Sequence, residues 1–374
     1  MIAGEASGDA LGGPLIRALK KRNIEVTGIG GHFMEAEGLK SLLPMDQLCV
    51  MGLFEVIKHL PRLLKLMNAV VLEIEKANPD VVVTIDLPDF NFRVAKMLKK
   101  RGRFQGKIVH YVAPSVWAWR PKRAEKVAQF LDGMMCLFPF EPKFFEPHGL
   151  NAVYVGHPLI VNDHTKKCDD FRELYNLQKD SRVVGIYLGS RVAEIQKHKD
   201  IFRDLILFLK QQDKTIEFLV PSLPDMQFNA LRAMSDMEVC PIVLNDEQNK
   251  WDVMRACDMA IAVSGTVGLE LSYMNIPHVV MYKANFWTGL IVRLVIKTRF
   301  VHLANIILDK GVVPEFLQGR CSSLFIATEL AKMIKDPEVL NAQKASFEEL
   351  RETMKDGLEK ANPSDHAANF LLNI

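Results

Sequence analysis

The chain has 374 residues, of which 49% are hydrophobic and 25% charged, and its formal net charge is +2. This length is typical of two domains with a core each, and so small a charge argues against a nucleic-acid binder that works mainly through phosphate attraction. The six cysteines show no CxxC spacing, which favours reduced thiols in the cytosol over a disulfide framework or a zinc site. The first residues do not match a signal peptide, and no uncharged apolar stretch reaches the roughly 18–20 residues that a bilayer span needs.

Short apolar runs alternate with helical patterns along the whole chain. A first series of strands is expected at 26–29, 81–85, 108–112, 134–138 and 153–155. A second series is expected at 183–188, 216–220, 242–244, 259–263 and 278–282. Helical patterns lie between them, for example at 11–20, 92–100 and 195–209. This alternation predicts parallel sheets with crossover helices.

The polar, proline-containing segment 156–167 separates the two series and is interpreted as a linker. We therefore predict an α/β protein with two Rossmann-like parallel-sheet domains that face a cleft. The first domain is expected over 1–156 and the second over 157–344. Since open α/β sheets bind ligands beyond the carboxyl ends of their strands, the residues that follow each strand are the candidates for function.

In the first domain, Asp86 directly follows the buried run 81–85, where a carboxylate could accept a proton from an attacking hydroxyl. The alternative is that Asp86 or Asp89 caps the next helix. Asp89 is the better cap because it directly precedes the helical pattern, which leaves Asp86 free. Gly4, Gly8, Gly12 and Gly13 are expected to form a glycine-rich turn from strand to helix. Their spacing matches neither GxGxxG nor a P-loop, so dinucleotide and ATP sites are not indicated.

In the second domain, Gly189, Ser190 and Arg191 end one apolar run, and a turn at 264–266 ends another. Glycine allows close approach of the backbone, helix N-termini attract phosphate, and arginine can hold a diphosphate in bidentate fashion. Glu270 lies one turn further on and would repel a bare phosphate, but it suits the hydroxyls of a ribose. The alternative is an ordinary strand-to-helix turn. The chain has no DxD triad, HExxH or paired Cys/His ligands, which argues against a metal-dependent transferase.

Three segments combine apolar residues with cations and could contact a lipid surface. They are the amphipathic pattern 53–74, in which Pro61 is expected to cause a kink, the segment 117–123, and the pattern 286–297. The alternative is that the apolar faces belong to the core and the cations are simply solvated. The sequence leaves both interpretations open.

Eight motifs occur in a characteristic order: AGEASGD at 3–9, VMGLFEV at 50–56, IDLPDFN at 85–91, HYVAPSVWAWR at 110–120, GHP at 156–158, GSR at 189–191, SGT at 264–266 and VPEFLQ at 313–318. Together they resemble the bacterial lipid-A-disaccharide synthases over nearly the whole chain. The resemblance implies a two-domain GT-B glycosyltransferase that joins UDP-2,3-diacylglucosamine to 2,3-diacylglucosamine 1-phosphate and releases UDP. It further implies an inverting reaction without metal or cofactor, and a cytoplasmic enzyme bound peripherally to the inner membrane.

Carried over by position, the resemblance implies that Asp86 is the base on the acceptor hydroxyl and that Arg191 contacts the UDP phosphates. The other residues implied on the nucleotide side are Gly189, Ser190, Ser264, Gly265, Thr266, Glu270, Asn305 and Gln318. Those expected on the acceptor or lipid side are Glu5, Ser7, Met51, Ser115, Trp117, Trp119 and Arg120. A C-terminal helix at about 345–374 is expected to pack back on the first domain, and a homodimer that exchanges it is left open.

The chain departs from the family pattern at its start, where only Ile2 and Ala3 precede the glycine-rich turn, so the first sheet is expected to lose most of a central strand. Two other functions stay open. One is a different GT-B enzyme, such as a UDP-N-acetylglucosamine 2-epimerase, which needs no lipid surface. The other is a degenerate homologue that binds nucleotide or lipid without turnover.

Overall fold

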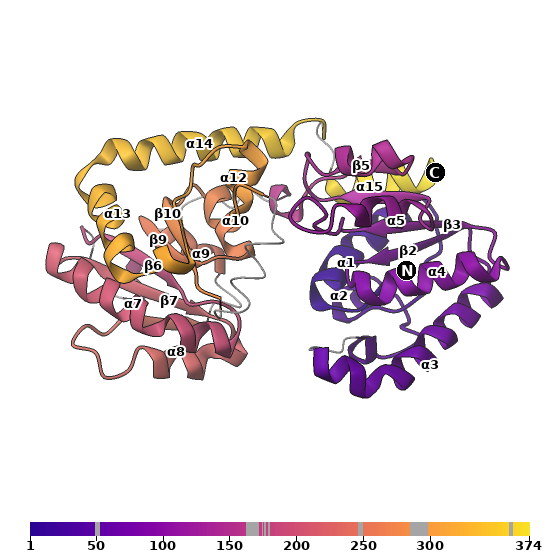
Figure 1. Cartoon of the computed structure of the whole chain (residues 1–374), viewed down its shortest axis with the longest axis horizontal. Coiled ribbons are helices and arrows are strands. Elements are labelled where there is room, and N and C mark those ends of the chain that lie inside the picture. The colour runs from indigo at the N-terminus through magenta and orange to yellow at the C-terminus, as the bar shows by residue number, and fades with distance from the viewer. Residues whose placement is uncertain are drawn as a thin grey trace. The chain divides into compact units, whose positions relative to one another are not determined.

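The computed structural model describes residues 1–48, 53–161, 172–173, 175, 177–178, 180–245, 250–284, 298–358 and 362–374, with no side-chain detail for 53–60. The chain divides into two compact units (Figure 1). Unit 1 comprises Met1–Val161 and Met354–Ile374, so both ends of the chain belong to it, and unit 2 comprises Asn162–Thr353. Several predicted features lie wholly or partly outside the described residues: Met51, the motif at 50–56, the pattern 286–297 and the linker after residue 161.

Unit 1 contains a parallel sheet whose strands follow the order β1-β2-β3-β4-β5. The strands are β1 (Ile2–Ala3), β2 (Val81–Ile85), β3 (Lys107–Tyr111), β4 (Gly133–Cys136) and β5 (Asn151–Tyr154). Although β1 has two residues, it pairs with β2 and also bridges to Ile29 on its other side. The strand expected at 26–29 is therefore reduced to isolated bridges. After β1 the chain first passes to Ile29 on one side of this strand and later to β2 on its other side, so the strand order reverses at β1. A ligand is therefore expected at the carboxyl ends of β1 and β2.

Helices cover both faces of this sheet and enclose two apolar clusters. They are α1 (Ala6–Lys20), α2 (His32–Ala36), α3 (Leu53–Ala77), α4 (Pro88–Arg101), α5 (Lys122–Ala128) and α15 (Pro363–Leu372). The segment expected as one helix at 345–374 consists of the end of α14 (Pro337–Lys355) and of α15. The guanidinium of Arg22 ties α15 to the end of α1 by donating to Asp365 at 3.0 Å and to Asn369 at 2.9 Å.

Unit 2 contains a six-stranded parallel sheet in the order β11-β10-β9-β6-β7-β8. Its strands are β6 (Val183–Tyr187), β7 (Glu217–Ser222), β8 (Ile242–Asn245), β9 (Met259–Val263), β10 (His278–Tyr282) and β11 (Glu315–Leu317). The described helices are α7 (Val192–Gln212), α8 (Gln227–Ala233), α9 (Lys250–Ala256), α10 (Thr266–Tyr273), α12 (Leu303–Leu308), α13 (Ser323–Lys335) and most of α14. The chain runs outward from β6 to β8 and then returns to β9 on the other side of β6. The carboxyl ends of β6 and β9 thus form the switch point at which ligands of such sheets bind.

Apolar side chains on the two faces of the unit 2 sheet form separate clusters. One cluster joins the sheet to α7, α8 and α13 through residues such as Phe202, Leu205 and Leu330, which are fully buried. Burial of apolar surface is the main force that holds such layers together. Among the helices that the structure describes, none is both long enough and apolar enough to cross a membrane.

Candidate active site

A cavity of about 370 Å³ lies at the switch point of unit 2, where β6, β7 and β9 end. It brings together most of the residues that the sequence places on the nucleotide side: Gly189, Ser190, Arg191, Ser264, Gly265, Thr266 and Glu270. The turn after β6 leads into α7 and the turn after β9 into α10, so two helices begin at this cavity. Helix N-termini and glycine-containing turns of this kind are suited to an anion.

Glu194 contacts the turn that follows β6, and the sequence analysis missed it. Its Oε2 atom accepts the Ser190 N–H at 3.1 Å, and its Oε1 atom lies 3.7 Å from the guanidinium of Arg191. Gly189 has φ 101°, and a Cβ there would lie 2.6 Å from the same carboxylate. The side chain of Arg191 is 77% exposed and so remains available to a ligand.

Glu270 also lines this cavity and forms an ion pair there. The ammonium of Lys250, the first residue of α9, lies 2.7 Å from Oε1 and 2.7 Å from Oε2 of this carboxylate. Lys250 also lines the cavity, although no sequence motif pointed to it. The cavity is thus lined by two cations, Arg191 and Lys250, each of which faces a carboxylate.

Asn305 and Gln318 do not belong to the described residues that line this cavity. Asn305 is buried, and its amide oxygen accepts the N–H groups of Val312 and Val313 at 2.9 and 2.8 Å. Its amide nitrogen donates to Glu315 at 2.8 Å, so the side chain holds the loop before β11 together. Gln318 follows β11 with φ 52°. A nucleotide contact for either residue stays a prediction.

In unit 1, the carboxylate of Asp86 lies at the carboxyl ends of β1 and β2, where the strand order reverses. Its Oδ2 atom accepts the Ser7 hydroxyl at 2.7 Å and its Oδ1 atom accepts the Leu87 N–H at 2.9 Å. The amide of Asn91 donates to the Asp86 carbonyl at 2.7 Å and so ties this turn to α4. Glu5 is the N-cap residue of α1, two positions before Ser7. The structure thus brings Ser7 and Asp86, two predicted residues far apart in sequence, into contact.

The predicted cap at Asp89 is wrong. Helix α4 begins at Pro88, its N-cap residue is Leu87, and no side chain caps it. Proline suits the first helical position because its missing N–H would lack an intrahelical partner there, so the helix starts before Asp89. The Asp89 side chain is 95% exposed and lies 3.6 Å from Arg123.

The segment after β3 carries the other residues predicted on the acceptor or lipid side. Trp117 donates its indole N–H to the buried Glu141 at 3.4 Å, which anchors the ring in unit 1. Trp119 is 39% exposed, and the Arg120 guanidinium lies 4.1 Å from its ring centroid. Ser115 is also exposed. Ser115, Trp119 and Arg120 therefore lie at the surface, whereas Trp117 is half-buried.

The amphipathic pattern 53–74 forms the main part of α3, in which Pro61 is included. Met67 and Val71, which the amphipathic pattern places on its apolar face, are buried in the core of unit 1. Leu64 is 49% exposed and Leu72 is 50% exposed. The second half of this helix therefore contributes to the core and also leaves leucines at the surface.

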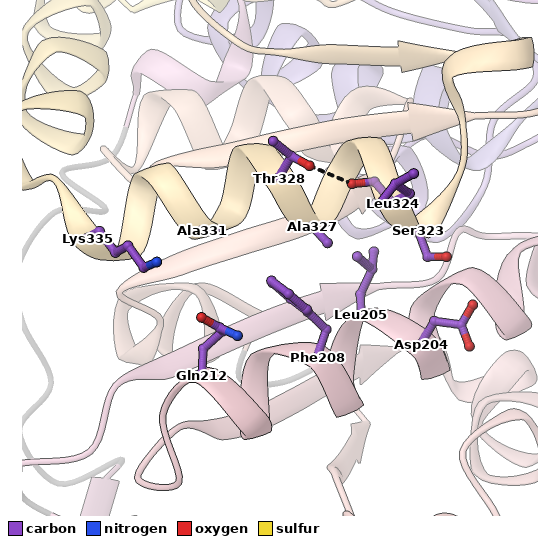
Figure 2. A pocket seen from close by; sticks show the side chains of 10 residues that line it. All are labelled: Asp204, Leu205, Phe208, Gln212, Ser323, Leu324, Ala327, Thr328, Ala331 and Lys335. Atoms are coloured by element: carbon purple, nitrogen blue, oxygen red, sulfur yellow. Dashed lines mark hydrogen bonds between the residues drawn. The ribbon is translucent and has the colours of Figure 1, made fainter.

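A second cavity, of about 540 Å³, lies between α7 and α13. Figure 2 shows Leu205 and Phe208 of α7 opposite Ala327 of α13, with charged side chains, Asp204 and Lys335, only at its rim. It contains no residue predicted for function. The cavity at the ends of β6 and β9 is therefore the candidate nucleotide site.

Two parallel-sheet units with this topology define the class as a GT-B type glycosyltransferase fold, and solved structures share it. A UDP-N-acetylglucosamine 2-epimerase from Neisseria meningitidis aligns with a TM-score of 0.63 at 14% identity, covering 98% of this chain and 97% of the other. MurG from Acinetobacter baumannii aligns with a TM-score of 0.57 at 12% identity, covering 100% and 98%. The family model described as lipid-A-disaccharide synthetase matches residues 1–368.

Curated relatives agree with the family model. The lipid-A-disaccharide synthase of Rhodospirillum centenum is 36% identical over 378 residues, covering 100% of this chain and 94% of the relative. That of Alcanivorax borkumensis is 37% identical over 368 residues, covering 96% and 94%. The chain therefore belongs to the lipid-A-disaccharide synthetase family and is a glycosyltransferase of lipid A biosynthesis.

Proposed function

We propose that the chain transfers 2,3-diacylglucosamine from UDP-2,3-diacylglucosamine to the 6-hydroxyl of 2,3-diacylglucosamine 1-phosphate. The bond from the sugar C1 to the UDP oxygen breaks, a bond from C1 to the acceptor O6 forms, and the configuration at C1 inverts. The products are the β-1,6-linked disaccharide 1-phosphate and UDP. Membership of the family supports the reaction. The roles of individual residues are supported by one observation: most of the predicted nucleotide-side residues line the same cavity.

In this proposal Asp86 takes the proton of the acceptor hydroxyl as the new bond forms. Its carboxylate is held by hydrogen bonds from Ser7 and Leu87, so its orientation is set before the substrate arrives. A carboxylate has about four acceptor sites, and these two bonds leave sites open for a hydroxyl. Such pre-organisation is what a general base requires.

The UDP leaving group gains negative charge as its bond to C1 breaks. Arg191 is the residue that we assign to this charge, because a guanidinium stays protonated and can hold two phosphate oxygens. Ser190, Ser264 and Thr266 supply hydroxyls on the same cavity, and Glu270 is assigned to the ribose. We propose that these groups act without a metal ion or cofactor.

We also propose that the enzyme works at the cytoplasmic side of the inner membrane as a peripheral protein. The exposed leucines of α3 and the pair formed by Trp119 and Arg120 support contact with lipid head groups. Aromatic rings and cations at a surface favour the interface of an anionic bilayer.

The test is an assay with both diacylglucosamine substrates in mixed micelles, followed by thin-layer chromatography, with and without a metal chelator. We expect disaccharide 1-phosphate and UDP in equal amounts, and no effect of the chelator. A β configuration at the new bond, determined by NMR, would verify inversion. Epimerised nucleotide sugar in the absence of acceptor, or UDP binding with no disaccharide formed, would contradict the proposal.

A further inference from the structure

The contact between Lys250 and Glu270 joins two helices at the nucleotide cavity. Lys250 begins α9 and Glu270 lies in α10, and both line the cavity. The ammonium is 2.7 Å from each of the two carboxylate oxygens. The side chains are 36% and 20% exposed, so the pair is partly shielded from water. An ion pair in such a place is stronger than one at the open surface.

A bidentate ammonium restricts the rotation of the carboxylate about its last bond. Each carboxylate oxygen can accept two hydrogen bonds, so Glu270 keeps acceptor sites for two further donors. The same ammonium neutralises a carboxylate that would otherwise repel a diphosphate bound nearby. Lys250 also lies 5.2 Å from the ring centroid of Trp251, which limits the directions that its chain can take.

We propose that Lys250 is a positioning residue of the nucleotide cavity, because it holds the Glu270 carboxylate in the orientation that accepts the ribose hydroxyls of a uridine nucleotide. The inference rests on the proposed function, since it assumes that the cavity binds UDP. It predicts that Lys250 contributes to the preference of the cavity for a ribonucleotide over a deoxyribonucleotide. A lysine that merely supplied positive charge to the phosphates would not affect that choice.

The test compares the affinities of UDP and 2′-deoxy-UDP by titration calorimetry. Lys250→Met keeps most of the length of the side chain but removes its charge, and Lys250→Arg keeps the charge. Lys332→Met is the matched control, because Lys332 is paired with Glu329 at 3.2 Å on α13 and does not line the cavity. Urea unfolding of each variant shows whether it is folded.

We expect Lys250→Met to weaken UDP about tenfold and 2′-deoxy-UDP only about twofold, since a misplaced carboxylate loses charge-assisted hydrogen bonds that only the ribonucleotide makes. Lys250→Arg should restore most of the discrimination, and the control should resemble the wild type. Equal losses for both nucleotides, or no loss, would overturn the inference while the proposed function stands. A wild-type chain that binds neither nucleotide would overturn both.

Discussion

Asp86, Leu87 and Val112 all have a positive φ, at 52°, 43° and 83°, and none of them is glycine. For a β-branched residue such as Val112 this conformation is a clear outlier, and each such residue costs on the order of 1–3 kcal/mol. Asp86 and Leu87 follow β2 and Val112 follows β3, so all three lie at the carboxyl edge of the sheet in unit 1. Unfavourable backbone conformations persist only where the surrounding structure enforces them, and they are common at functional sites. Their presence at this edge therefore supports a functional site there.

Replacing the proposed base tests its role directly. We expect Asp86→Asn to lower turnover by about 10²–10⁴-fold, because the amide cannot take the proton of the acceptor hydroxyl. The affinity for UDP should stay unchanged, since the nucleotide residues belong to unit 2. Asp89→Asn is the control: it removes a carboxylate three residues away that is 95% exposed, and its turnover should match the wild type. Normal turnover of Asp86→Asn would refute the assignment.

Arg191 is open to a similar test on the nucleotide side. We expect Arg191→Ala to weaken UDP binding by about 10–100-fold and to slow transfer as well, because a charge-assisted bidentate contact is lost. Calorimetry measures the first effect and the micelle assay the second. Arg203→Ala is a suitable control, since Arg203 lies on α7, the helix that Arg191 precedes, and donates to the carbonyl of Asp236. An unchanged UDP affinity of Arg191→Ala would remove the arginine from the phosphate site.

Secondary structure elements could be predicted where apolar runs are long enough to show a period. The strands expected at 81–85, 259–263 and 278–282 coincide with β2, β9 and β10. β11 was missed because three residues cannot establish an alternation. The expected strand 26–29 is reduced to bridges because its neighbour β1 has only two residues to pair with.

The part of the candidate site that could be predicted from the sequence consists of residues that directly follow the strands. Ser190, Arg191 and the turn at 264–266 lie where the sequence placed them, because parallel strands deliver their loops to one edge. Glu194 had a local signal, an acidic residue three positions after the N-cap of α7, which is typical of a capping interaction. Lys250 had none, because its contact with Glu270 depends on how two helices pack.

The loop between β3 and α5 depends on one buried side chain, Glu141. Its carboxylate accepts the N–H groups of Leu137 and Phe138, both at 3.0 Å, in addition to the indole of Trp117. Burial raises the pKa of Glu141 to about 8, although these three donors oppose the shift. The loop that carries Trp117 is therefore attached to the end of β4 through this carboxyl group.

Removal of that carboxyl group should loosen the loop. We expect Glu141→Ala to lower the free energy of unfolding by about 1–3 kcal/mol, because buried N–H donors lose their acceptor. Glu141→Gln should cost less, since one amide oxygen can still accept from the backbone. Urea unfolding measures both, and Glu146→Ala, at an exposed carboxylate nearby, is the control. Equal midpoints for Glu141→Ala and the control would show that the loop does not depend on Glu141.

Buried histidines are found in both units, and they couple the stability of the whole protein to pH. In unit 1, burial lowers the pKa of His110 to about 3 and that of His157 to about 4. In unit 2, burial lowers the pKa of His278 to about 4. His302, whose Nε2 atom lies 3.1 Å from Nε2 of His278, has a pKa well below its usual value because of burial and of that neighbour.

The sign of the effect follows from proton uptake. Below about pH 6.5 these histidines bind protons in the unfolded chain but stay neutral in the folded one, so stability falls as pH falls. The loss continues down to the folded pKa values of about 4 and 3. Glu141 acts in the opposite direction, because its raised pKa favours the folded state at lower pH. In unit 1 the two histidines, of which His110 is buried and His157 half-buried, outweigh the one carboxyl group.

We therefore expect the free energy of unfolding to be highest near neutral pH and to decrease between pH 6.5 and 4, by up to about 1.4 kcal/mol per pH unit for each buried histidine. Urea titrations at several pH values would measure this slope. His302→Asn should make it shallower, because asparagine can still accept the Ala304 N–H at the start of α12 but does not titrate. A stability that is flat or rises as pH is lowered through this window would show that the histidines take up protons within the folded protein.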